Sequence, residues 1–158
     1  AVRARMPPDS GLIARKLEDA DLVIVAAPEY LRRHGTPESL DALQQHECIQ
    51  FLLPSSGQTT PWLLRQQERD IALLTKGGLR CSDDILGPVT LARSGAGLLQ
   101  TYRFIVEQDL QQGTLQEVLH QFGGAARPFS LLYPSNRHMP QRVRVLIDFL
   151  LLRLKFIE

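Results

Sequence analysis

The 158-residue sequence lacks most of the features that mark metalloproteins, membrane proteins and secreted proteins. Its only cysteines, Cys48 and Cys81, are 33 positions apart and have none of the paired Cys or His partners that a zinc site requires. The mostly apolar stretch 147–152, which contains Asp148, is far too short to cross a bilayer. No signal peptide opens the chain. We therefore expect two reduced thiols in a cytoplasmic protein, with no metal, no cofactor and no membrane partner.

The sequence also lacks an excess of positive charge. Eighteen basic residues against seventeen acidic ones leave a net charge of +1. Affinity for nucleic acid depends largely on phosphate contacts made by lysine and arginine, so a freestanding DNA-binding protein is not expected. With 44% hydrophobic and 22% charged residues, the chain can bury an ordinary core. Its length suits one domain or two small lobes.

Catalytic residue patterns are missing as well. The four histidines, His34, His46, His120 and His138, show no metal-ligand spacing with one another. The pair Ser94-Gly95 lacks the glycine pattern of a nucleophile elbow, and Gly95-Ala-Gly97 lacks the third glycine of a dinucleotide-binding loop. The sequence predicts no catalytic residues and favours a protein that is not an enzyme.

What is present is an alternation of strand and helix patterns. Residues 22–27 and 49–53 are apolar, β-rich runs of the kind buried on both faces of a sheet. A hairpin is predicted for 62–65 with 71–74, and Ser82-Asp83-Asp84 supplies capping side chains for a helix to about residue 93. Further strands are predicted at 1–6, 12–17, 79–81, 98–101, 113–119 and 127–134, and helices at 40–45, 104–111 and 141–150. This order indicates an α/β architecture with a largely parallel sheet.

Several short motifs occur in an order that resembles one family. They include Asp9-Ser-Gly-Leu-Ile-Ala-Arg-Lys-Leu17, Ala26-Ala-Pro-Glu-Tyr-Leu-Arg-Arg-His-Gly35, Gly95-Ala-Gly-Leu-Leu99 and the ending Tyr133-Pro134 before the last helix. Each motif alone is weak, but their joint order over about 155 residues resembles the C-terminal part of LysR-type transcriptional regulators. Two positions depart from the family pattern: Tyr102 stands where proline is usual, and Asp83 replaces the commoner asparagine.

The resemblance implies a two-lobed α/β fold like that of type II periplasmic binding proteins, with the first lobe incomplete. Residues 19–113 would form the second effector lobe, and residues 1–18 and 114–158 the remainder of the first. The helix-turn-helix that binds DNA in the family would not be in this chain. DNA would then be a partner only through that other domain, and the regulatory domain is expected to form homodimers or higher homo-oligomers.

The resemblance also implies a ligand site for a small, anionic effector in the cleft between the lobes. The expected ligand-binding residues are Arg3, Phe51, Leu52, Leu53, Ser55, Ser82 and Thr101. Arg3 offers a guanidinium that pairs with carboxylates, while Ser55 and nearby backbone amides are suited to hold a carboxylate beside Phe51. An ordinary strand end, a plain helix cap and an exposed arginine are the competing interpretations of these residues.

Two other functions remain open on sequence grounds. A solute-binding protein of a transport system shares the two-lobed architecture, although the Pro28-x-Tyr30-Leu31 turn and the Tyr133-Pro134 ending favour the regulator. An enzyme with the same sheet topology is less favoured, because the chain offers no acid, base or metal set.

Overall fold

The computed structural model describes residues 1–3, 11–134 and 140–154, and it divides into two compact units. Unit 1 comprises Ala1–Ala20 and Ala126–Glu158, and unit 2 comprises Asp21–Ala125. The expected lobe boundaries follow residues 18 and 113, whereas residues 114–125 group here with unit 2. The fold is the mixed α/β architecture that the sequence predicts.

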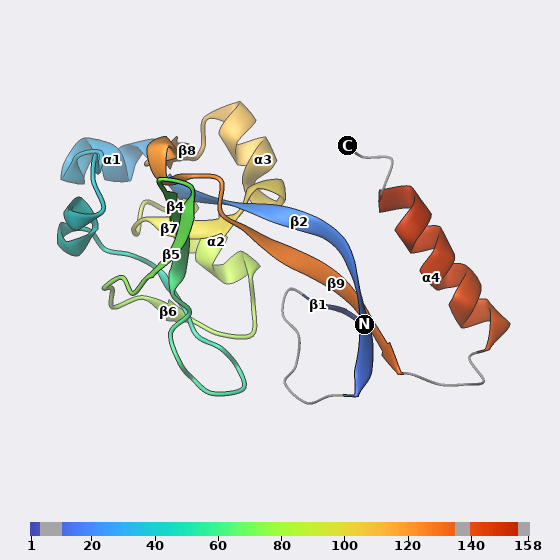
Figure 1. Ribbon diagram of the computed structural model, residues 1–158. Coiled ribbons are helices and arrows are strands. Elements are labelled where there is room, and N and C mark those ends of the chain that lie inside the picture. Colours follow the sequence, from blue (N-terminus) through green and yellow to red (C-terminus); the bar gives the residue numbers. More distant parts are fainter. Residues whose placement is uncertain (4–10, 135–139, 155–158) are drawn as a thin grey trace. The chain divides into compact units, whose positions relative to one another are not determined.

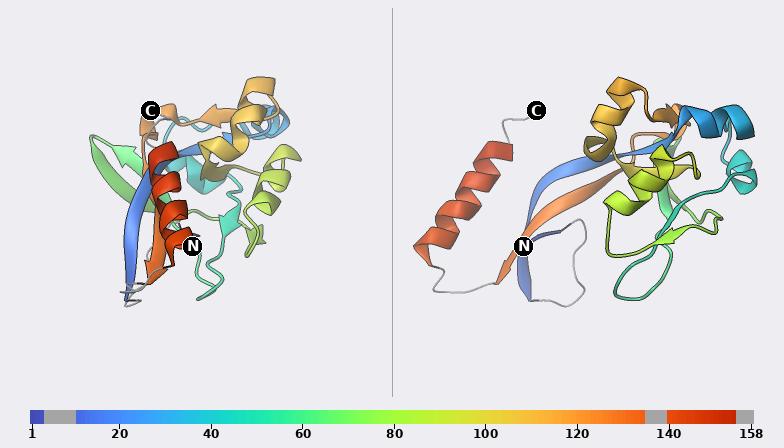
Figure 2. Two further views of the ribbon diagram at one scale, coloured as in Figure 1. Left: turned by 90° about the vertical axis from the view of Figure 1, so that its right-hand side faces the viewer. Right: turned by 180° about the vertical axis from the view of Figure 1, so that it is seen from behind.

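Unit 1 is built on paired strands and one helix. Strand β1 (Val2–Arg3) pairs antiparallel with β9 (Ala126–Pro134), and β9 lies beside the first half of β2 (Leu12–Ala26). Figures 1 and 2 show β2 as one continuous, curved strand. The sequence predicted two separate strands here, because polar residues interrupt the apolar pattern. Pairing with β9 in unit 1 and with other strands in unit 2 keeps the intervening residues extended.

Unit 2 contains a mixed sheet. Strands β7 (Leu99–Tyr102) and β8 (Gln116–Val118) both pair antiparallel with β2. On the far side of β7, Cys48 and Leu98 form a parallel bridge, and β3 (Gln50–Phe51) pairs parallel with β6 (Arg80–Cys81). Among the described strands of this sheet, β8, β7, β3 and β6 therefore run one way and β2 runs the other. The prediction of a largely parallel sheet fails at β2, which enters unit 2 from unit 1.

Both faces of this sheet are covered, which explains the continuous apolar run in β2. On one face, Val25 and Ile49 pack with Val89 of α2 (Leu86–Arg93) and Val106 of α3 (Arg103–Gln112). On the other face, Ile24 packs in a cluster with side chains of α1 (Pro28–His34), the 3-10 helix η1 (Asp41–Gln45) and β4 (Trp62–Gln66). Successive residues of β2 thus face opposite cores.

The remaining elements of unit 2 follow the sequence closely. The predicted hairpin is confirmed: β4 pairs antiparallel with β5 (Arg69–Leu73), and residues 67–68 form the turn. Gly113, in a left-handed conformation with φ 72°, ends α3, and η2 (His120–Phe122) follows β8. Two predictions were wrong in detail. The helix expected at 40–45 is a short 3-10 helix, and the strand expected at 49–53 pairs over only two residues before the chain turns.

The last helix, α4 (Gln141–Leu154), has a partly covered apolar surface. Ile147 is buried, and Val143 and Leu150 are half-buried on the same side. The exposed apolar side chains of this helix are Val145, Leu146, Phe149 and Leu152. The sequence predicts one apolar stripe on this helix, made of Val143, Leu146, Ile147, Leu150 and Leu154. Leu146 of this stripe is exposed, while the side chain of Leu154 lies outside the described residues.

We expect the isolated chain to self-associate at micromolar concentration through this surface. Covering one such side chain contributes roughly 1.5–3 kcal/mol, and this helix exposes four of them at three- and four-residue spacing. Sedimentation velocity checks the expectation, and Phe149→Glu should shift the population toward monomer. A well-folded wild-type monomer at these concentrations would contradict it.

Candidate functional site

The parallel strands of unit 2 end along one edge of the sheet, and this edge gathers four of the residues expected to bind a ligand. Phe51 is paired with Cys81, and the amide of Leu52 donates to the carbonyl of Cys81 at 2.8 Å. The bridge between Cys48 and Leu98 sets the register that places Phe51 in one row with Thr101. Phe51, Leu52, Ser82 and Thr101 therefore lie together where β3, β6 and β7 end, which we call the carboxyl edge. Open α/β sheets bind ligands at such edges.

Leu53 and Ser55 belong to a closed turn that leads away from this edge. Leu53 donates its amide to the carbonyl of Gln58 at 2.8 Å, and its own carbonyl accepts from Gly57 at 2.7 Å. Leu52 and Thr59 form an antiparallel bridge behind the turn, and Ser55 is exposed. The backbone amides of Leu52 and Leu53 are thus already engaged within the protein. The hydroxyl of Ser55 is exposed on this turn, and its role as a ligand group stays a prediction.

The start of α2 is capped by a carboxylate of the chain itself. Asp84 accepts hydrogen bonds from the amides of Leu86 at 2.8 Å and Gly87 at 3.1 Å. The predicted capping by this segment is confirmed, and Asp84 provides the cap. Ser82 donates a longer hydrogen bond, 3.4 Å, to the carboxylate of Asp83, whose backbone has φ 63°. A carboxylate therefore already fills the place at this helix end that an anion would take.

Arg3 lies in unit 1, where it pairs with Ser130 across β1 and β9 and is exposed. Its guanidinium has the geometry to bind a carboxylate in bidentate fashion. Its role as a ligand residue stays a prediction that rests on the sequence pattern.

Sequence reasoning did not propose the exposed apolar side chains around the carboxyl edge. Ile85 and Leu86 at the start of α2 are 51% and 57% exposed, and Phe104 at the start of α3 is 59% exposed. The ring of Tyr102 stacks on that of Phe104, with centroids 5.6 Å apart and planes 19° apart. The signal available was Tyr102, which departs from the family pattern at this position.

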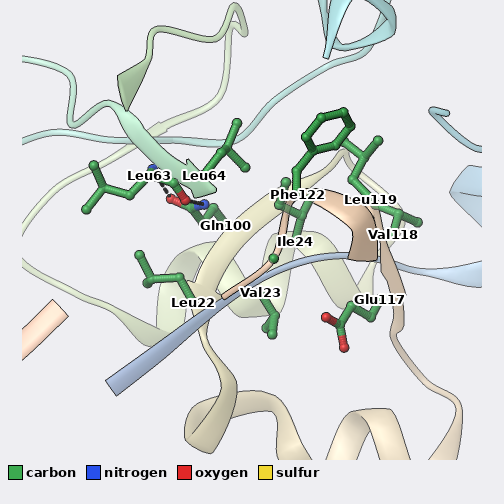
Figure 3. Close-up of a pocket in the computed structure, with 11 residues that line it drawn as sticks. Leu22, Val23, Ile24, Leu63, Leu64, Gln100, Glu117, Val118, Leu119 and Phe122 are labelled. Carbon is green, nitrogen blue, oxygen red and sulfur yellow. Dashed lines mark hydrogen bonds between the residues drawn. The ribbon is translucent and has the colours of Figure 1, made fainter. Parts of the chain in front are cut away.

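A small hollow lies beneath the β4–β5 hairpin, on the face of the sheet opposite the one that α2 and α3 cover (Figure 3). The side-chain amide of Gln100 makes two hydrogen bonds to the main chain of Leu63, 2.8 and 2.7 Å long, and so ties the hairpin to β7. Phe122 and Leu119 line the hollow, which has room for about one water molecule. It is far too small for an effector, since ligand pockets commonly measure about 300–1,000 Å³.

Two histidines flank Tyr30 on the α1 side of unit 2. The Tyr30 hydroxyl accepts a hydrogen bond from the amide of Glu47 at 3.0 Å and lies 3.1 Å from Nδ1 of His46. The His34 ring stacks on the Tyr30 ring with centroids 4.5 Å apart. Burial, reinforced by the charge of nearby His34, lowers the pKa of His46. The arrangement suits a neutral His46 whose Nδ1 accepts the phenolic hydrogen.

We expect stability to fall as the pH drops below about 6.5, the ordinary histidine value. The folded state holds the pKa of His46 below that value, so the unfolded chain takes up the proton first. The stabilisation is therefore complete above pH 6.5 and is lost as the pH falls toward the folded pKa. Thermal unfolding between pH 5 and 8 checks this, with His46→Asn as the control because its side-chain oxygen can still accept from Tyr30. Equal pH dependence in both proteins would contradict the expectation.

The described residues contain no group of three or more His, Cys, Asp or Glu side chains arranged to hold a metal ion. Both cysteines are free, and burial raises the pKa of the Cys48 thiol to about 12, which makes it a poor nucleophile. Within the part of the chain that the structure covers, no helix is long and apolar enough to span a membrane.

An α/β structure whose strand ends gather polar and aromatic side chains is suited to binding a small ligand. Comparison with known proteins identifies its family. Residues 1–155 match the model of the LysR substrate binding domain, and the chain belongs to this family.

Curated relatives include the transcriptional regulator CrgA of Neisseria meningitidis serogroup B, 35% identical over 151 residues, which cover 95% of this chain and 49% of CrgA. PtxR of Pseudomonas aeruginosa is 34% identical over 152 residues, covering 95% of this chain and 47% of PtxR. The chain thus spans about half the length of these relatives.

Solved structures agree with these relationships. The CrgA regulatory domain from Neisseria meningitidis has 30% identity and a TM-score of 0.79, covering 97% of this chain and 74% of that domain. The full-length Vibrio cholerae virulence activator AphB has 26% identity and a TM-score of 0.75, covering 96% of this chain and 49% of AphB. The chain therefore belongs to the substrate-binding domain family of LysR-type regulators, and its relatives are transcriptional regulators and not transport proteins.

Proposed function

We propose that a small-molecule effector binds at the carboxyl edge of unit 2 and changes DNA binding by another part of a longer protein. The observation that carries this proposal is the convergence of Phe51, Leu52, Ser82 and Thr101 at that edge. The hydroxyls of Ser82 and of Ser55, in the adjoining turn, provide polar groups, and Phe51 offers an apolar surface. Such a combination is typical of small-molecule sites.

In this proposal the protein is a cytoplasmic, non-enzymatic sensor that acts as a homo-oligomer. The matched family consists of transcriptional regulators, which supports a regulatory rather than a catalytic role. The exposed apolar surface of α4 supports self-association. The net charge of +1 supports the view that DNA contacts come from elsewhere in the longer protein.

The proposal is tested by comparing two proteins on the same operator at physiological salt. We expect the 158-residue chain to show no operator-selective binding in a gel-shift assay, and the longer regulator that carries it to bind selectively. Nanomolar, operator-selective binding by the chain alone would overturn the proposal that another part of a longer protein binds DNA.

A further inference from the structure

We propose that the carboxyl edge of unit 2 binds an aromatic or bulky apolar part of the effector, and that the effector's polar group there is uncharged or cationic. This inference rests on the proposed function and specifies the ligand class for the same site. It departs from the anionic effector that the sequence suggested.

The preference for an aromatic or apolar ligand follows from apolar side chains that are exposed around the carboxyl edge. Phe104, Ile85 and Leu86 are each more than half exposed, and they begin the two helices that follow β7 and β6. Tyr102 and Phe104 present stacked rings, and Phe51 is half-buried at the end of β3. Exposed aromatic and aliphatic side chains of this kind favour a planar or bulky apolar ligand.

The preference against an anionic group follows from hydrogen bonds that the backbone and side chains at the carboxyl edge already make within the protein. An anion needs free amides or free cations, and the amides of Leu52 and Leu53 donate within the protein. The first amides of α2 donate to the carboxylate of Asp84. The edge therefore offers an anion few of the donors that commonly bind one.

The arginines that are nearest in sequence to the carboxyl edge do not supply the positive charge that an anionic ligand would need. Arg103, beside Tyr102, donates to the carboxylate of Glu117 at 2.7 Å. Arg80 lies one residue back on β6, and strand alternation directs its side chain to the face opposite that of Cys81 and Phe51. The exposed carboxylate of Asp83 makes the local charge negative instead.

The behaviour of Cys81 is consistent with this environment. Burial, and then the negative charge of Asp84, raise the pKa of its thiol. Both effects disfavour a negative charge at the end of β6, and they would act on an anionic ligand group in the same way.

The test uses three indole probes that share one ring system and differ in charge: tryptamine, tryptophol and indole-3-acetate. Calorimetric titration into the 158-residue chain at pH 7 should give the tightest binding for tryptamine and the weakest for indole-3-acetate, with about a fivefold difference in Kd between them. Tryptophol should fall between. Tightest binding of indole-3-acetate, or no binding of any probe at millimolar concentration, would overturn the proposal.

Two surface variants separate the two parts of the inference. Asp83→Asn should reduce the difference in Kd between tryptamine and tryptophol, with the Asp84 carboxylate retained, and asparagine tolerates the positive φ at this position. Phe104→Ala should weaken all three probes about equally, and circular dichroism should show an unchanged fold because the side chain is exposed. An unchanged preference in Asp83→Asn, or unchanged affinities in Phe104→Ala, would contradict the corresponding part. If an anionic ligand binds and alters operator affinity of the longer regulator, this inference fails while the proposed function stands.

Discussion

Replacing Gly77 with alanine is expected to lower the free energy of unfolding by about 3 kcal/mol or more. A Cβ at this position would lie 1.9 Å from the carbonyl oxygen of Cys48, which is backbone and cannot rotate away. The neighbouring contacts hold the two segments together: the amide of Cys48 donates to Lys76, and the amide of Gly78 donates to the carboxylate of Glu47. Separating them would disturb the segment that leads into β3.

The adjacent glycine provides a matched control. A Cβ at Gly78 would meet its nearest atom, Oε1 of Glu47, at 3.9 Å, which is ordinary van der Waals contact. Gly78→Ala should leave stability unchanged or slightly higher, because alanine restricts the unfolded chain. Urea unfolding of the two variants checks the expectation. Similar stability of Gly77→Ala and Gly78→Ala would contradict the close approach at Gly77.

Replacing Asp109 with alanine is expected to cost about 2 kcal/mol of stability, because hydrogen bonds to charged groups each contribute about 1.5–3 kcal/mol. The buried Asp109 carboxylate accepts two hydrogen bonds from the Arg93 guanidinium, both 2.7 Å long, and one from the Thr114 hydroxyl at 2.8 Å. This network joins α2, α3 and the chain that leads to β8. Arg93 is half exposed and can be hydrated when its partner is removed, which keeps the cost below that of a fully buried pair.

The effect of this substitution should depend on pH. Hydrogen bonding from Arg93 lowers the pKa of Asp109 below its usual value of 3.8. The unfolded chain therefore takes up the proton first, so the stabilisation is complete above that value and is lost as the pH falls through the folded pKa. Asp70→Ala is the control, since Asp70 pairs with Arg65 on the surface and should contribute little. Equal stability of the Asp70 and Asp109 variants at pH 7 would contradict this account.

The elements that the sequence predicted best are those that local chemistry determines. The hairpin around residues 67–68 and the Asp84 cap of α2 each depend on a few neighbouring residues. The continuous strand β2 could not be predicted in this way. Glu18, Asp19 and Asp21 interrupt its apolar pattern, and only pairing with strands distant in sequence keeps this stretch extended.

The candidate site likewise combines residues that the sequence could identify with features that depend on contacts distant in sequence. Family resemblance selected Phe51, Leu52, Ser82 and Thr101, and the register of the parallel strands then brought them to one edge. The exposure of Phe104 and the engagement of the loop amides depend on tertiary packing and hydrogen bonding. Apart from the unusual Tyr102, residue types and spacing carry no signal of either feature, although both decide which ligands the edge suits.

The effector response of the longer regulator tests most directly whether the carboxyl edge of unit 2 senses the effector. Operator affinity would be titrated against a molecule that binds the wild-type chain, in wild type, Ser55→Ala and Phe51→Ala. We expect both variants to keep wild-type operator affinity without ligand and to need a higher ligand concentration for the same change, with the larger shift in Phe51→Ala. Dose-response curves identical to wild type in both variants would contradict the claim.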